Sequence, residues 1–199
     1  MKTILMTGFG PFGNVEKNPS QALIEELNLS ADLATNAQLK TEILPVIYGD
    51  AVDRIRALIH EHEPDFLISF GVAARRENVC PERVALNLKD TQQPDNAGNT
   101  PEGELIFSES PLAYFSNLPL LEIRDFLQIA GIPTEISNHA GAYICNAVFF
   151  AAAHEIETTG RTTEFGFIHI PLMPLEAAAG ELSTQKLANA VVDLIGELV

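Results

Sequence analysis

Short apolar runs alternate along this chain with longer stretches in which apolar residues recur at a helical period. The runs have the length and composition of buried β-strands and lie at residues 3–7, 40–47, 66–70 and 164–170. Between the second and third runs, residues 50–62 place Val52, Ile55 and Ile59 on one helical face. Strand, helix and strand in repeated order predict an α/β fold with a mainly parallel sheet. The length of 199 residues suits one domain, spanning residues 1–199.

Further helices are predicted at residues 21–27, 119–130, 145–156 and 183–198. Ser20, Asp50 and Ser183 stand at helix starts, and we expect their side chains to cap those helices. Residues 133–136 are expected to form an additional strand. Residues 90–103 show neither period and predict a long irregular loop, which in a compact domain is usually functional or mobile.

A small-residue turn at Ala140-Gly141 brings a cysteine to the start of the helix predicted at 145–156. Cys145 is thereby placed where the helix has unpaired N–H groups and a positive dipole end. We expect this position to lower the pKa of the thiol from about 8.5 and to supply N–H groups for an oxyanion. Cys145 is therefore a candidate nucleophile. The alternative is a structural role, because free cysteines are often buried.

A base and a carboxylate that could serve such a nucleophile lie elsewhere in the chain. His169 ends the strand predicted at 164–170 and, by alternation, shares a face with Phe165 and Phe167. Ligands of open α/β sheets bind at the carboxyl ends of strands. Glu82 could orient the imidazole. Spacing alone leaves simpler alternatives open, with His169 as a core residue and Glu82 in a surface ion pair with Arg83.

Charge and composition narrow the possible partners. With 27 acidic residues against 12 basic ones, the chain carries a net charge of −15. Such a surface repels nucleic acids and anionic membranes, and we expect neither as a partner. Gly8 interrupts the first apolar run too early for a signal peptide, which predicts a cytoplasmic protein with Cys80 and Cys145 unpaired. No metal and no cofactor is expected, because His, Cys, Asp and Glu show no ligand spacing.

Residues 8–13 read G-x-G-x-x-G, which is the spacing of a dinucleotide-binding loop. That fingerprint has to open a helix directly after a strand. Here Pro11 interrupts the motif, and the next helix signal comes only at residues 18–20. The alternative reading, which we favour, is a loop that presents Phe9 and Phe12 to a small ligand.

Several collinear motifs of the chain resemble those of pyroglutamyl peptidases (pyrrolidone-carboxylate peptidases), a family of cytosolic cysteine peptidases. The motifs are Thr7-Gly-Phe-Gly-Pro-Phe12 with Asn18-Pro-Ser20, Glu82-Arg-Val-Ala-Leu-Asn87, Pro94-Asp-Asn-x-Gly-Asn, Ser137-x-x-Ala-Gly-x-Tyr-x-Cys145-Asn146 and Phe167-x-His169-x-Pro171-x-x-Pro174. The resemblance covers essentially the whole chain. It implies a single-domain α/β/α sandwich of the phosphorylase/hydrolase-like type with a mixed sheet. It also implies Cys145, His169 and Glu82 as a catalytic triad that cleaves an N-terminal pyroglutamyl residue from peptides through a thioester, and a dimer or tetramer.

The same resemblance implies a pocket for the five-membered lactam. Its candidate substrate-binding residues are Phe9, Phe12, Asn18, Val72, Gln92, Gln93, Tyr143 and Ile144. Val72 stands where the family commonly has glutamine, and Gln92 stands where it commonly has an arginine associated with oxyanion stabilisation. These departures leave an alternative, in which the protein is a divergent, weakly active or silent relative that binds a small ligand or a peptide N-terminus.

Overall fold

A computed structural model describes residues 1–29, 37–173 and 182–198. Its central sheet has five strands in the order β2-β1-β3-β7-β4. Their bounds are β1 Lys2–Phe9, β2 Ala37–Leu44, β3 Phe66–Val72, β4 Cys80–Pro81 and β7 Glu164–Ile170. The first four in spatial order are parallel, and only β4 runs antiparallel to its neighbour β7. A small antiparallel sheet of β5 (Val84–Leu86) and β6 (Ala113–Phe115) lies beside the main one.

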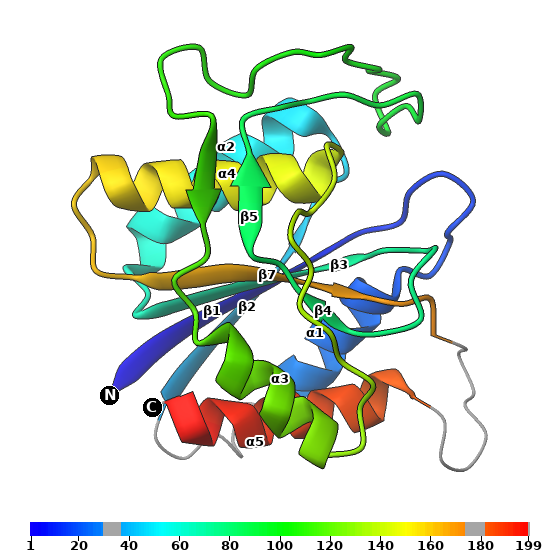
Figure 1. The fold of residues 1–199 in the computed structure, drawn as a ribbon, viewed down its shortest axis with the longest axis vertical. Helices are drawn as coiled ribbons and strands as arrows, with labels where there is room; N and C mark the ends of the chain where they lie inside the picture. The colour runs from blue at the N-terminus through cyan, green and yellow to red at the C-terminus, as the bar shows by residue number, and fades with distance from the viewer. Residues whose placement is uncertain (30–36, 174–181, 199) are drawn as a thin grey trace.

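Helices cover both faces of the main sheet, as Figure 1 shows. One layer contains α1 (Pro19–Leu29), α3 (Leu120–Ile129) and α5 (Thr184–Leu198). The opposite layer contains α2 (Tyr48–His62) and α4 (Ile144–Thr158), which pack against each other. The predicted α/β/α sandwich with a mixed sheet is thus confirmed. None of the helices in the described residues is long and apolar enough to cross a bilayer.

Alternation along the strands divides the core into two apolar clusters, one on each face of the sheet. In β7, Ile168 and Ile170 belong to the cluster beneath α1, α3 and α5. Phe165 and Phe167 belong to the cluster beneath α2 and α4. A strand buried on both faces needs apolar residues at nearly every position, which explains the continuous apolar runs. His169 follows the same alternation and lies on the α4 side, as predicted.

Two of the three predicted helix caps are wrong, and the reason is tertiary. Asn18, not Ser20, caps α1, because its side-chain oxygen accepts the Ser20 backbone N–H at 3.0 Å. For α2 the cap is Asp95 from the long loop, whose carboxylate accepts the Tyr48 N–H at 3.0 Å. Asp50 lies within the first turn instead. The third prediction is confirmed, since Ser183 accepts a hydrogen bond from the third residue of α5 at 3.1 Å.

The strand predicted at residues 133–136 does not form as an element. The segment makes only isolated bridges, Val79 with Thr134 and Glu82 with Ser137, along the outer side of β4. The glycine-rich stretch 8–13 does not open a helix either, because β1 continues to Phe9 and α1 begins only at Pro19. This geometry removes the dinucleotide-binding alternative, which required a helix at that point.

Candidate active site

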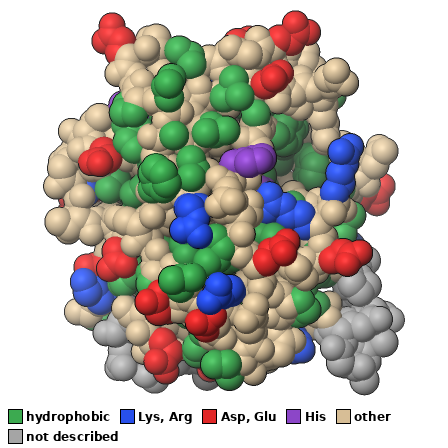
Figure 2. Space-filling model, in the orientation of Figure 1, with side chains coloured by type: hydrophobic (Ala, Val, Ile, Leu, Met, Phe, Trp, Pro, Cys, Tyr) green, Lys and Arg blue, Asp and Glu red, His purple; other side chains and the backbone are tan. Residues whose placement is uncertain are grey.

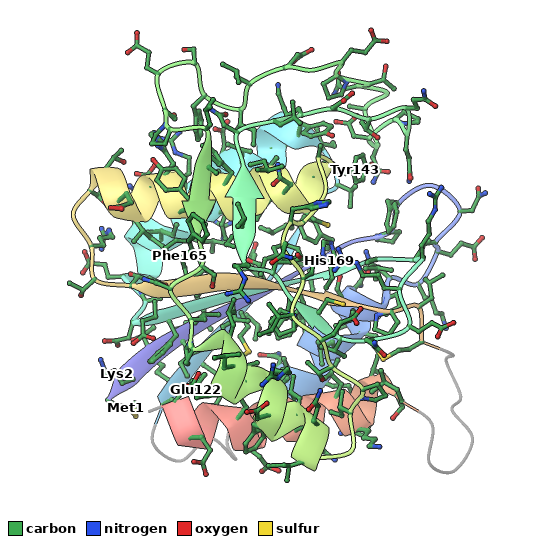
Figure 3. All side chains as sticks on the ribbon, in the orientation of Figure 1. Met1, Lys2, Glu122, Tyr143, Phe165 and His169 are labelled. Carbon is green, nitrogen blue, oxygen red and sulfur yellow. The ribbon has the colours of Figure 1, made fainter. Side chains whose placement is uncertain are left out.

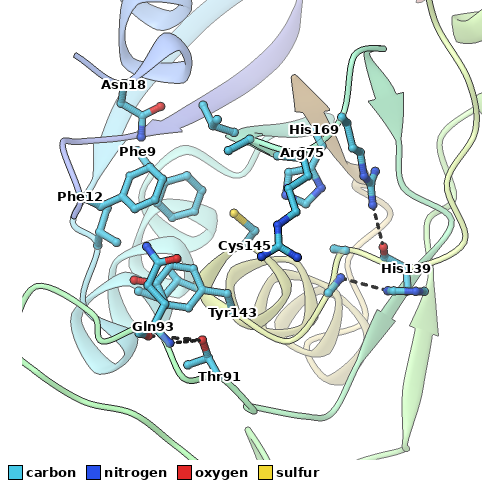
Figure 4. Close-up of a pocket in the computed structure, with 18 residues that line it drawn as sticks. Phe9, Phe12, Asn18, Arg75, Thr91, Gln93, His139, Tyr143, Cys145 and His169 are labelled. Carbon is cyan, nitrogen blue, oxygen red and sulfur yellow. Dashed lines mark hydrogen bonds between the residues drawn. The ribbon is translucent and has the colours of Figure 1, made fainter. Parts of the chain in front are cut away.

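A cavity of about 460 Å³ opens at the carboxyl ends of β1, β3 and β7, beside the start of α4 (Figure 4). This volume is in the range of small-molecule sites. Figure 3 places His169 and Phe165 at opposite ends of β7, with Tyr143 toward the His169 end. The walls come from segments far apart in the sequence, including the loops after β1 and β3 and the turn before α4. The cavity therefore lies where parallel-sheet proteins usually bind ligands.

Cys145 is the second residue of α4, is half-buried and lines the cavity. Its sulfur lies against the backbone of Gly71, where an added Cβ would come within 2.8 Å of Sγ. Gly71 in turn is the register partner of His169 in the β3–β7 ladder. The backbone of Gly71 therefore lies beside both the nucleophile candidate and the base candidate. Cys80 is buried, pairs with His169 in the β4–β7 ladder and does not line the cavity, and both cysteines are free, as predicted.

His169 and Glu82 form a buried pair. Nδ1 of His169 lies 2.6 Å from Oε1 of Glu82, and Glu82 is fully buried. A carboxylate accepts, so Nδ1 donates and Nε2 is left for the cavity. Glu82 is positioned by β4, because its backbone N–H bonds the Phe167 carbonyl at 2.8 Å. The surface pair with Arg83 considered from the sequence is not formed, since Arg83 bonds Asn138 instead.

Arg76 completes this group and was missed by the sequence reading. Its Nη1 donates to Oε1 of Glu82 at 2.6 Å, and its Nη2 donates to the His139 carbonyl at 3.3 Å. The arginine thus links the buried carboxylate to the turn before α4. Among the described residues, Oε2 of Glu82 has no hydrogen-bond partner. The available signal was its place in the charged loop that follows the carboxyl end of β3.

Burial controls the protonation of the two reactive groups. Desolvation, followed by repulsion from Glu82, raises the pKa of the Cys145 thiol to about 12. Desolvation also lowers the pKa of His169, although its hydrogen bond to Glu82 works in the opposite direction. The expected lowering of the thiol pKa is not found, because loss of solvation is the largest effect on this thiol. At neutral pH the site holds a thiol beside a neutral imidazole.

One end of the cavity is largely apolar. Phe9 at the end of β1 and Phe12 form this end, and Val72, Tyr143 and Ile144 also line the cavity. The hydroxyl of Tyr143 donates to the Pro94 carbonyl at 3.0 Å, which attaches the long loop to the start of α4. These five residues were all predicted to contact substrate, and the fold brings them to one cavity.

Two predicted binding residues have a different placement. Asn18 lines the cavity, but its amide N–H bonds the Gly10 carbonyl at 2.8 Å while its oxygen caps α1. Gln92 is exposed and does not line the cavity, whereas Gln93 does, together with Thr91. The Thr91 hydroxyl accepts the Gln93 N–H at 3.0 Å, and this tight turn leaves Gln92 outside the wall. In the described residues no three His, Cys, Asp or Glu side chains gather to hold a metal.

Comparison with known proteins gives consistent matches. A family model described as pyroglutamyl peptidase matches residues 2–192. The chain is 39% identical over 195 residues to a pyrrolidone-carboxylate peptidase of Vibrio vulnificus, a match covering 96% of this chain and 88% of the relative. It is 42% identical over 168 residues to one of Thermococcus kodakarensis, covering 84% and 80%.

Solved structures agree with these sequence matches. The pyroglutamyl peptidase I of Bacillus amyloliquefaciens superposes with a TM-score of 0.88 at 35% identity, covering 96% of this chain and 94% of that one. The pyrrolidone carboxyl peptidase of Thermococcus litoralis superposes with a TM-score of 0.90 at 32% identity, covering 100% and 93%.

Proposed function

Because the chain belongs to the pyroglutamyl peptidase family, we propose that it removes the N-terminal pyroglutamyl residue from peptides as a cysteine peptidase. The activity is assigned to one domain over residues 1–199. The observation that carries the proposal is that Cys145 and His169 line one cavity, while the fully buried Glu82 lies 2.6 Å from the imidazole of His169. This arrangement matches a nucleophile, its base and the carboxylate that orients the base.

The raised thiol pKa defines the first step. Cys145 attacks the pyroglutamyl carbonyl carbon as its proton passes to Nε2 of His169, so no thiolate has to accumulate beforehand. Glu82 accepts the Nδ1–H bond and stabilises the imidazolium that forms. N–H groups in the first turn of α4, including that of Cys145, are free to bind the oxyanion. One good donor of this kind is worth about a hundredfold to a thousandfold in rate.

His169 then returns the proton to the leaving amine, and the peptide departs with a new N-terminus. A water molecule attacks the thioester with His169 again as the base, and this step releases pyroglutamate and restores the thiol. Phe9 and Phe12 at the apolar end suit a compact uncharged lactam, and Val72 adds an apolar side chain to the cavity wall. The ionised side chain of an ordinary N-terminal glutamate would lose its hydration there without an ionic partner.

A pyroglutamyl-arylamide tests the proposal. Wild type and Cys80→Ala should hydrolyse it, and Cys145→Ala should be slower by at least about a thousandfold. Substitution at Cys80 is the matched control, because it removes the other thiol of the chain, which does not line the cavity. Equal background rates in all three proteins would instead favour a silent relative that only binds a ligand.

We also propose that the chain forms a dimer or tetramer. Leu112 and Phe115 are 79% and 66% exposed beside or on the edge strand β6. Figure 2 shows apolar side chains gathered on this part of the surface. Apolar side chains of this size around an unpaired strand edge favour association. Light scattering should give a multiple of 21.6 kDa for wild type and a smaller mass for Phe115→Glu. An equal mass for both would remove β6 from the interface.

We infer a cytoplasmic location. We expect peptides with a pyroglutamyl N-terminus as the partners, and neither nucleic acids nor membranes. The support is the net charge of −15, which disfavours polyanionic surfaces. Cell fractionation tests the location, and retention on heparin at low salt would contradict the charge argument.

A further inference from the structure

The cavity has a cationic end that the mechanism does not use. Of the described residues that line it, none is aspartate or glutamate, although the chain carries a net charge of −15. Two adjacent arginines lie on its wall, Arg75 and Arg76. Arg76 is bound to Glu82 and to the His139 carbonyl. Arg75 is exposed and makes no hydrogen bond or ion pair within residues 1–29, 37–173 and 182–198.

Figure 4 places Arg75 relative to the nucleophile. Phe9 and Phe12 lie on one side of the Cys145 sulfur, and Arg75 lies on the other side with its guanidinium directed into the cavity. His169 and His139 are on the Arg75 side. The two ends of the cavity therefore differ in chemistry, with aromatic rings at one end and a cation available for binding at the other.

The proposed reaction indicates which part of the substrate lies at each end of the cavity. The uncharged lactam suits the aromatic end, and the leaving amine has to face His169, which protonates it. The residue that follows the scissile bond then extends toward Arg75. A guanidinium can donate two parallel hydrogen bonds to one carboxylate, and this bidentate pair is among the strongest hydrogen-bonded interactions that an arginine makes.

We propose that Arg75 forms a subsite for a carboxylate on the first residue of the leaving peptide, so that the protein prefers pyroglutamyl peptides continuing with an acidic residue. This inference rests on the proposed pyroglutamyl peptidase function. Because Arg75 is exposed, water screens the ion pair, and the preference should be about 1.5-fold to fivefold in kcat/KM.

Two isosteric substrates measure the preference without changing shape. They are pyroglutamyl-glutamate amide and pyroglutamyl-glutamine amide, which differ only in the side-chain charge of the leaving residue. Wild type should favour the first, and 0.5 M KCl should reduce the ratio because it screens the ion pair. Arg75→Gln should bring the ratio close to one, and Arg75→Glu should reverse it. Arg124→Gln is the matched control, because it removes the same charge from α3 outside the cavity, and it should keep the wild-type ratio.

A third substrate identifies which carboxylate is bound. Pyroglutamyl-glutamine with a free C-terminus carries only an α-carboxylate, and a gain over its amide that depends on Arg75 would extend the subsite to dipeptides. A wild-type ratio of one, or a ratio unchanged in Arg75→Gln, would overturn the role of Arg75 while leaving the peptidase function intact. Failure of wild type to hydrolyse any of the three would overturn the proposed function and this inference with it.

Discussion

Gly71 provides the sharpest test of how the nucleophile is positioned. It pairs with His169 in the ladder between β3 and β7. A Cβ added to Gly71 would lie 2.7 Å from the Phe167 ring and 2.8 Å from the Cys145 sulfur. Ordinary contact begins at 3.4 Å, so both neighbours would have to move by about 0.6 Å or more. The ring is fixed in the core, and the sulfur, which borders the cavity, is the atom that can move.

The magnitude of the effect follows from that displacement. Overpacking of this size costs about 1–3 kcal/mol of folding stability, which for a chain of this length is a fall in Tm of roughly 2–12 °C. Misplacement of a reacting atom by about 1 Å costs about a hundredfold in rate. Gly71→Ala should therefore lower kcat/KM on a pyroglutamyl-arylamide by about tenfold to a hundredfold while the protein stays folded at 25 °C.

Gly49→Ala is the matched control. Gly49 lies in the first turn of α2, and a Cβ there would meet nothing within 4 Å. This variant should keep wild-type kcat/KM and gain up to about 1 kcal/mol of stability, because alanine favours a helix more than glycine. Thermal melting followed by circular dichroism and initial-rate kinetics would be measured on the three proteins. A Gly71→Ala protein with wild-type kcat/KM would refute the idea that Gly71 sets the place of the sulfur.

Three further predictions concern the support of the site. Arg76→Met leaves the buried Glu82 carboxylate without its cation and should lower the free energy of unfolding, measured with urea, by about 3 kcal/mol. Arg76→Lys should recover part of this loss. An unchanged urea midpoint in Arg76→Met would refute the importance of the pair. Asn146 makes three hydrogen bonds of 2.8–2.9 Å to the backbone of Leu86 and Leu88. Asn146→Ala should therefore lower the free energy of unfolding by about 2–4 kcal/mol in the same assay. A loss below about 1 kcal/mol would argue against this anchoring role. Because the pKa of His169 is lowered in the folded protein, the unfolded chain binds a proton below about pH 6.5 while the folded chain does not. The free energy of unfolding should therefore fall below that pH, by at most about 1.4 kcal/mol per pH unit. His169→Gln should remove this part of the pH dependence.

Much of the secondary structure was predictable because it depends on near neighbours. β7 was predicted at residues 164–170 and is found at Glu164–Ile170. The last helix was expected to start after Ser183, and α5 begins at Thr184. Period-two alternation also placed His169 on the face shared with Phe165 and Phe167. These features follow from the side-chain direction in a strand or helix, which a few consecutive residues determine.

The failures involve partners that are distant in the sequence. Asp95 caps a helix that begins 47 residues earlier, and Asp50 looked equally suitable from its local position. Gln92 was expected at the cavity, but the turn made by Thr91 directs it outward. The place of Arg76 in the charged loop after β3 marked it as near the site but did not predict its contact with Glu82. Polar side chains satisfy hydrogen bonds wherever the chain brings them, so local pattern is a weak guide to their contacts.

The sequence by itself determined an α/β fold with a mainly parallel sheet and a cysteine at a helix start, because strand and helix periods are local properties. Its motifs also pointed to one family. Only the tertiary structure decided that Glu82 is buried against His169 and Arg76, since this contact joins positions 87 residues apart. Burial also decided the protonation of the site, because desolvation depends on every group packed around the thiol of Cys145 and raises its pKa where the helix position alone predicted a lower one.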